Sequence, residues 1–320
     1  MPTVSDTADT GDGDDGDRET TASGRRAGGR TRTDGGGDAA TVTGETPVGR
    51  RRSWSSRVAV GRWLFRATVG VLFAFLLAPI VVVAVTSFST TGAVAVPPPG
   101  LSTRWYEALL ASARWQRAAL NSLIAAGGTT LLATVAGTAA ALAVNGLGDR
   151  REAVVLGLTV LPLLVPGVVL GVSLLVFLGE FGLQQTYLAV VAAHSLWATP
   201  LAFSVVRASL SRFDPRLREA ALDLGASRPR AFVEVVAPNV RSGLFAAALI
   251  AFVVSLQEFV MTLFVSGPDT RTVPVLAWNS LRGSVDPIVS VVSTLLVATV
   301  VLVVAVGAAV AGLERFATDT

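Results

Sequence analysis

Six long apolar runs, separated by shorter polar segments, dominate the chain from residue 67 onward. They cover residues 67–85, 123–144, 153–178, 187–206, 243–265 and 288–313. A helix needs about 20 residues to cross a hydrocarbon core of about 30 Å, so each run is long enough to span a membrane. The pattern predicts an all-α integral membrane protein with six transmembrane helices.

Several of these runs carry residues that break a helix or let helices approach closely. The third run contains Pro162 and Pro166, followed by Gly167, and the fourth contains Pro200. Helix breaks at membrane depth are tolerated only where protein or a water-filled cavity surrounds them. The second run is rich in Gly, Ala and Thr, which suits close helix–helix contact. We therefore expect the spans to pack together as a bundle.

The placement of arginine predicts the orientation of the spans. Residues beyond position 49 contain 21 arginines. With the N-terminus inside the cell, sixteen of them fall in inner segments and five in outer loops. Because cytoplasmic loops carry an excess of basic residues, we predict that both the N-terminus and the C-terminus lie inside.

Composition supports a membrane protein and excludes several kinds of catalytic site. The chain of 320 residues is 51% hydrophobic and 15% charged, whereas a soluble domain carries about 25% charged residues. It has no lysine, no cysteine and one histidine, His194. This excludes a Walker A loop, a Schiff-base lysine, a thiol nucleophile and a multi-histidine metal site. We expect no catalytic residue, metal or cofactor in this chain, so any ATP must be bound by another chain.

The N-terminal segment differs from the rest of the chain. Residues 1–49 hold ten acids and five arginines and almost no large apolar residues. Such a segment cannot bury enough surface to offset the entropy of ordering. We divide the chain into a disordered acidic tail (1–57), a first helix with an outer loop (58–116), a core of five helices (117–313) and a short inner tail (314–320).

A polar segment of unusual length, residues 207–242, separates the fourth and fifth runs. Asp214 followed by Pro215 predicts the start of a short helix, and Gly225 predicts its end. Ser227 is expected to cap a second short helix that stops near Pro238. The segment is either an amphipathic surface element held at the lipid headgroups or a docking element for a cytoplasmic partner.

The same segment resembles the "EAA" loop of the permeases that serve binding-protein-dependent ABC importers. The resemblance rests on Glu219-Ala220-Ala221, on Gly225 four residues later, and on Pro238. "NSLIAA", "LPLLVPGVVLGVSLL" and "AHSLWATPLAF" precede it in the order and spacing of that family. The similarity covers about residues 97–313, and the combination is far more specific than an isolated E-A-A.

The resemblance implies a type I ABC importer transmembrane fold in the cell membrane, with the loop as a helix that docks on an ATPase. The docking residues it implies are Glu219, Ala220, Ala221, Leu224 and Gly225. The expected partners are cytoplasmic ABC ATPase subunits, a second permease subunit, an extracellular solute-binding protein and membrane lipid. By analogy with the polyamine branch, the second permease is expected to be a different chain. No nucleic acid partner is expected.

The fifth run indicates which solute is carried. The sequence "SLQEFVMTLFVSGPDTRTVPVLAW" resembles the spermidine/putrescine branch of the family, which often has two adjacent acids where this chain has Gln257 and Glu258. An ionisable residue inside the membrane usually faces a polar interior. We therefore consider Glu258, Gln257 and His194 as residues of a path for a small cationic solute. The alternatives are that Glu258 is structural, bonded to a neighbouring span or to His194, and that another small solute is carried.

Two other functional classes compete with an importer permease. A self-sufficient secondary transporter would show an inverted repeat with paired charges at corresponding positions of its halves. An intramembrane enzyme would need a serine or a carboxylate pair in its spans, and Glu258 is the only carboxylate well inside a run. We find no such pairing of charges, and the long polar loop would have no purpose in a secondary transporter.

Overall fold

A computed structural model describes residues 52–92, 96–144, 147–283 and 286–318 of the chain. Contacts divide the chain into residues 1–62 and 63–320, and the second unit contains the helix bundle. The predicted disordered tail lies outside the described residues, apart from its last six, which begin helix α1 (Arg52–Thr86). Within the described ranges the secondary structure is helical, as predicted, with one isolated bridge between Ser89 and Leu101.

Four of the predicted spans form single long helices. They are α1, α3 (Ala113–Val144), α6 (Tyr187–Leu210) and α13 (Ile288–Thr318). Each contains a segment long and apolar enough to cross a membrane. The number of candidate spans in the described chain rises from four to six if each of two bent helix pairs counts as one span.

The third predicted run forms one of these bent pairs, α4 (Asp149–Leu164) and α5 (Gly167–Glu180). Their axes differ by 98°. The break falls before Pro166, which has no N–H to donate to the carbonyl of Pro162 four residues earlier. The indole Nε1 of Trp197 in α6 donates to that carbonyl instead, at 3.2 Å. The break predicted from the prolines is therefore confirmed, and a neighbouring span satisfies the backbone group that it frees.

The fifth run, predicted as one continuous segment over 243–265, is divided into two helices. Helix α10 (Arg241–Gln257) ends where Glu258 takes an extended backbone conformation, with φ −65° and ψ 126°. Helix α11 (Val260–Val265) begins directly after Phe259. No proline or glycine marks this break in the sequence, so its cause must be a side chain rather than a local backbone preference.

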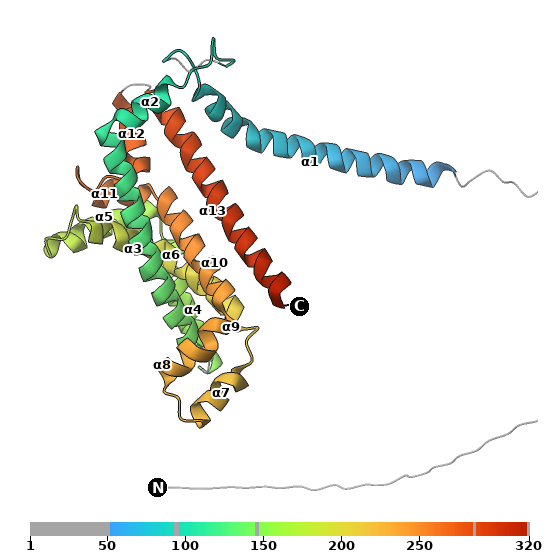
Figure 1. Cartoon of the computed structure of the whole chain (residues 1–320), viewed down its shortest axis with the longest axis vertical. Coiled ribbons are helices and arrows are strands. Elements are labelled where there is room, and N and C mark those ends of the chain that lie inside the picture. The colour runs from blue at the N-terminus through green and yellow to red at the C-terminus, as the bar shows by residue number, and fades with distance from the viewer. Residues whose placement is uncertain (1–51, 93–95, 145–146, 284–285, 319–320) are drawn as a thin grey trace, which may run out of the picture. The chain divides into compact units, whose positions relative to one another are not determined.

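The centre of the bundle is a three-helix contact in which α3 packs against α6 and α10 (Figure 1). Small side chains dominate the contact, and Ala133, Ala198 and Ala251 form one fully buried cluster, each from a different helix. At Gly137 a Cβ atom would lie 2.7 Å from the backbone nitrogen of Phe203. The close approach predicted from the Gly- and Ala-rich second run is confirmed.

Short helices occupy the two ends of the bundle. They are α2 (Arg104–Ala111), α7 (Pro215–Asp223), α8 (Arg228–Ala231), the π-helical turn η1 (Phe232–Val236), α9 (Ala237–Asn239) and α12 (Val273–Gly283). Helices α7 and α8 lie at one end, and α2 and α12 at the other (Figure 1). The loop predicted to be cytoplasmic and the loops predicted to be extracellular are thus at opposite ends of the bundle.

Substitution at the α3–α6 contact should destabilise the fold. We expect Gly137→Ala to lower the free energy of unfolding by about 1–3 kcal/mol, because the added methyl group meets backbone rather than a flexible side chain. Gly127→Ala on the same helix is the control, since no atom lies within 4 Å of the place that its added Cβ would take. Thermal unfolding of both purified variants in detergent measures the difference, and equal melting temperatures would contradict the close contact.

Candidate functional site

A buried polar cluster joins the fourth and fifth spans. His194 of α6 is fully buried, and its Nδ1 lies 2.6 Å from the Ser255 hydroxyl oxygen of α10. Its Nε2 lies 2.6 Å from the hydroxyl oxygen of Thr262 in α11. The imidazole therefore uses both ring nitrogens to connect three helices.

Glu258 is the centre of this cluster and explains the break between α10 and α11. Its carboxylate is completely buried and accepts hydrogen bonds from the backbone N–H groups of Met261 (2.7 Å) and Thr262 (3.0 Å). It also accepts a hydrogen bond from the Thr262 hydroxyl and lies 3.4 Å from Nε2 of His194. The first N–H groups of a helix lack helical partners and favour a negative charge. The side chain thus fixes the start of α11 at membrane depth.

The three predicted path residues fall into two groups. Glu258 and His194 have no exposed side-chain surface, whereas Gln257 is exposed at the end of α10. Glu258 forms its hydrogen bonds within its own run and approaches the neighbouring span at His194, 3.4 Å away. Among the described residues, no three His, Asp or Glu side chains gather as a metal ion would require.

An aromatic pair lies next to the break, and the sequence pattern did not point to it. The rings of Phe259 and Trp278 are 5.5 Å apart, and Trp278 of α12 is 43% exposed. Phe259 follows Gln257 by two residues, so the exposed amide of Gln257 and one ring of this aromatic pair both lie at the break between α10 and α11. The one sequence feature that could have indicated this pair is Trp278, a tryptophan in the predicted outer loop that follows the fifth run.

The polar loop forms the helix–glycine–helix that its sequence predicts. The Asp214 carboxylate accepts the backbone N–H of Arg216 at 3.0 Å, with Pro215 in the first position of α7. Gly225 has φ +89°, the left-handed conformation expected of a glycine after a helix. The second helix continues from α8 through η1 and α9 to Asn239, close to its predicted stop. One detail differs, because Ser227 precedes α8 but its side chain makes no capping bond.

Helix α7 is not part of the core of the bundle. It has no buried residue, whereas Phe232, Val236 and Val240 beyond it pack into the core cluster at this end. The family resemblance implies five docking residues. Glu219, Ala220 and Gly225 are exposed, and Ala221 is half-buried. The fifth, Leu224 at the end of the helix, is 90% exposed. The loop thus exposes the apolar side chain of Leu224 at the end of a helix that packs against α8 and η1.

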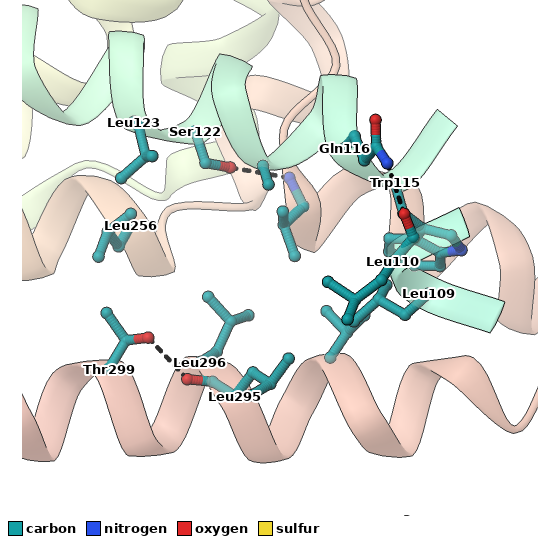
Figure 2. Close-up of a pocket in the computed structure, with 13 residues that line it drawn as sticks. Leu109, Leu110, Trp115, Gln116, Ser122, Leu123, Leu256, Leu295, Leu296 and Thr299 are labelled. Carbon is teal, nitrogen blue, oxygen red and sulfur yellow. Dashed lines mark hydrogen bonds between the residues drawn. The ribbon is translucent and has the colours of Figure 1, made fainter. Parts of the chain in front are cut away.

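The structure also contains an apolar pocket of about 330 Å³ between α2, α3 and α13. Figure 2 shows leucines on its walls, Leu109, Leu123, Leu256, Leu295 and Leu296. Its polar side chains already bond within the protein: Ser122 with the N–H of Val273, Gln116 with the carbonyl of Leu110, and Thr299 with that of Leu295. This pocket does not suit a polar solute.

Comparison with known proteins finds relatives among transport permeases. Residues 130–317 match the family described as "Binding-protein-dependent transport system inner membrane component". The chain is 29% identical over 247 residues to the spermidine/putrescine transport system permease protein PotC of Escherichia coli (strain K12), covering 77% of this chain and 93% of that protein. It is 31% identical over 238 residues to the putrescine transport system permease protein PotI of the same strain, covering 72% and 84%. A probable molybdenum ABC transporter permease of Haloferax volcanii is 32% identical over 202 residues, covering 59% and 75%.

Solved structures agree on the fold. A chain of a bacterial ABC transporter involved in the import of the acidic polysaccharide alginate superposes with a TM-score of 0.64 at 14% identity, covering 79% of this chain and 96% of that chain. A second structure, of the bacterial alginate ABC transporter in complex with a pentasaccharide-bound periplasmic protein, gives 0.60 at 17%, covering 80% and 96%. The fold is that of a type I ABC importer transmembrane subunit.

Loss of the Glu258 carboxylate should destabilise the fold. We expect Glu258→Ala to cost about 1–3 kcal/mol for each buried N–H left without an acceptor. Glu258→Gln keeps one carbonyl oxygen and should lie between wild type and Glu258→Ala. Thermal unfolding in detergent measures the series, with Gln257→Ala as the exposed neighbour that should leave the melting temperature unchanged. A Glu258→Ala protein as stable as wild type would contradict the capping role.

Proposed function

Because this chain belongs to the family of binding-protein-dependent transport system inner membrane components, we propose that it forms half of the translocation path of an ATP-driven importer. The protein is a multi-pass permease of the cell membrane, and its relatives are transport permease subunits. In the proposed reaction, a binding protein delivers a small solute outside and the solute passes between two permease subunits. The core proposed for this path is residues 117–313, and the second permease subunit is a different chain.

The exposed helix α7 is the observation that carries the ATP-driven part of the proposal. A chain with no lysine cannot form a Walker A loop, so the nucleotide must be bound by another subunit. Helix α7 lies outside the core and exposes Leu224 at its end. Burying a leucine side chain in an interface contributes about 1.5–3 kcal/mol of apolar transfer free energy. Leu224 is thus suited to insert into a groove on a cytoplasmic ATPase, with Glu219, Ala220, Ala221 and Gly225 around it.

Motion of the ATPase would reach the path through packed helices. Helix α7 contacts α8 and η1, and η1 leads through α9 into α10. Helix α10 ends at the break that holds Gln257 and Glu258. A 1:99 equilibrium between two orientations of the bundle is reversed by about 5.5 kcal/mol of differential binding, which ATP-driven closure of two ATPase subunits can supply.

The proposed solute is a small organic cation of the polyamine class. Relatives that span most of this chain are named for spermidine and putrescine. Gln257 and the ring of Trp278 offer an exposed amide and an aromatic face near the break, and aromatic faces attract ammonium groups. In this proposal Gln257 touches the solute, whereas His194 and Glu258 hold the break in position behind it.

Removal of the Leu224 side chain should uncouple the permease from its ATPase. We expect Leu224→Ala to weaken capture of the ATPase by about 30-fold, the effect of losing an interface anchor of about 2 kcal/mol. Leu131→Ala, which truncates a 69% exposed leucine on α3, is the matched control. Co-purification of the ATPase from native membranes and ATP-dependent uptake in proteoliposomes are the measurements. Uptake that persists without ATP would instead favour a self-sufficient transporter.

A second acid at the break should favour polycations. We expect Gln257→Glu to lower the KM for spermidine by about three- to tenfold, because a carboxylate near the path attracts the cation. Gln184→Glu, at an exposed position in the loop before α6, makes the same change elsewhere. Uptake of radiolabelled spermidine by the reconstituted importer measures the effect. No change in KM, or uptake of molybdate in place of spermidine, would contradict the polyamine assignment.

A further inference from the structure

The start of α3 and the helix α12 lie at the end of the bundle opposite α7 (Figure 1). Between them is a cleft of about 270 Å³ that the proposed transport path does not use. Three arginines line it, Arg114 and Arg117 from the start of α3 and Arg271 from the loop before α12. The other residues that line it are Ala113, Ala118, Asn121, Pro268 and Leu276. We refer to this site as the arginine cleft.

The floor of the arginine cleft is held in place by buried hydrogen bonds. The side-chain amide of Asn121 donates to the backbone carbonyls of Asp269 (2.8 Å) and Arg271 (2.9 Å). Its carbonyl oxygen accepts the hydroxyl of Tyr187 at 2.7 Å. These bonds fix the loop that carries Arg271 against the helix that carries the other two arginines, so the cleft exists before any ligand binds.

The charges of the cleft are incompletely balanced. Asp269 lies 3.4 Å from Arg117, but both side chains are mostly exposed, at 89% and 66%, and such a pair contributes little. Arg114 donates to the neutral hydroxyl of Ser280 at 2.6 Å. Within the described part of the chain, Arg271 has no acidic partner. The cleft therefore retains an excess of positive charge.

The position of the arginines along α3 separates them from the membrane. The apolar run of this helix begins at Leu123. At a rise of about 1.5 Å per residue, Arg117 and Arg114 lie about 9 and 14 Å beyond it. The headgroup layer is about 5–7 Å thick on each side of the hydrocarbon core. On a helix along the membrane normal, these side chains start at or beyond the outer edge of the headgroup layer, within reach of a protein on that side.

We propose that the arginine cleft receives a carboxylate-bearing loop of the extracellular solute-binding protein. This inference rests on the proposed function, which supplies such a partner on this side of the membrane. Arginine presents a planar set of donors that matches a carboxylate, and a preformed site avoids the cost of ordering the side chains at binding. An acidic loop on the partner would displace the weak link between Arg117 and Asp269 and would also pair with Arg271.

The test uses the complete transporter in nanodiscs of neutral lipid. Its probe is the solute-binding protein that co-purifies with the tagged wild-type complex, produced separately afterwards. We expect the double variant Arg117→Gln/Arg271→Gln to weaken binding of this protein about tenfold, as the loss of two partly exposed charge pairs implies. Raising the salt concentration should weaken wild-type binding and reduce the difference between the two proteins, because exposed charges are screened.

The matched control is Arg282→Gln, which removes an exposed positive charge from α12, outside the cleft. Its affinity should stay within about twofold of wild type. In proteoliposomes at saturating binding protein, the double variant should transport at the wild-type rate, which shows that the cleft acts in docking and not in solute passage.

Three outcomes would overturn the inference. Unchanged affinity in the double variant excludes the cleft as the docking site, and an equal loss in Arg282→Gln shows a general charge effect. A loss of transport that saturating binding protein does not restore assigns the arginines to an anionic solute. In contrast, a wild-type complex that takes up solute without ATP or without any binding protein contradicts the proposed function itself.

Discussion

Every backbone donor and acceptor that leaves a helix inside a membrane must find a partner within the protein, and this constraint shapes the centre of the structure. Lipid offers no hydrogen bonds, so an unpaired group there costs several kcal/mol. The two helix breaks meet the requirement in different ways. Trp197 supplies a donor to the carbonyl freed by Pro166, and Glu258 supplies acceptors to the first N–H groups of α11.

The two breaks lie against each other, so they behave as one structural unit. Helix α5 packs on α11, and at Gly171 a Cβ atom would lie 2.8 Å from the ring of Phe264. His194 ties α11 to α6 and α10 on the other side. This rigid arrangement turns Gln257 outward while Glu258 stays buried. These adjacent polar residues therefore differ in exposure, and only Gln257 offers its side chain to a solute in the proposed path.

The two ends of the bundle present opposite chemistry, which suits different partners. The inner end exposes an apolar leucine on a helix outside the core, a surface suited to a groove in a protein. The outer end offers three arginines on a floor fixed by Asn121. The helices α3, α6 and α10, packed closely through alanine and glycine, connect these ends.

The sequence by itself determined the features that depend on neighbouring residues. Run lengths, the break at Pro166, the start of α7 at Asp214 and the turn at Gly225 all follow from the local backbone preferences of proline, aspartate and glycine. The tertiary structure alone decided which polar groups are buried. The Glu258 carboxylate is buried against His194, 64 positions away along the chain, and the arginine cleft joins α3 to a loop about 150 residues later. Burial and charge balance are properties of packed surfaces, and no local pattern records which segments will meet.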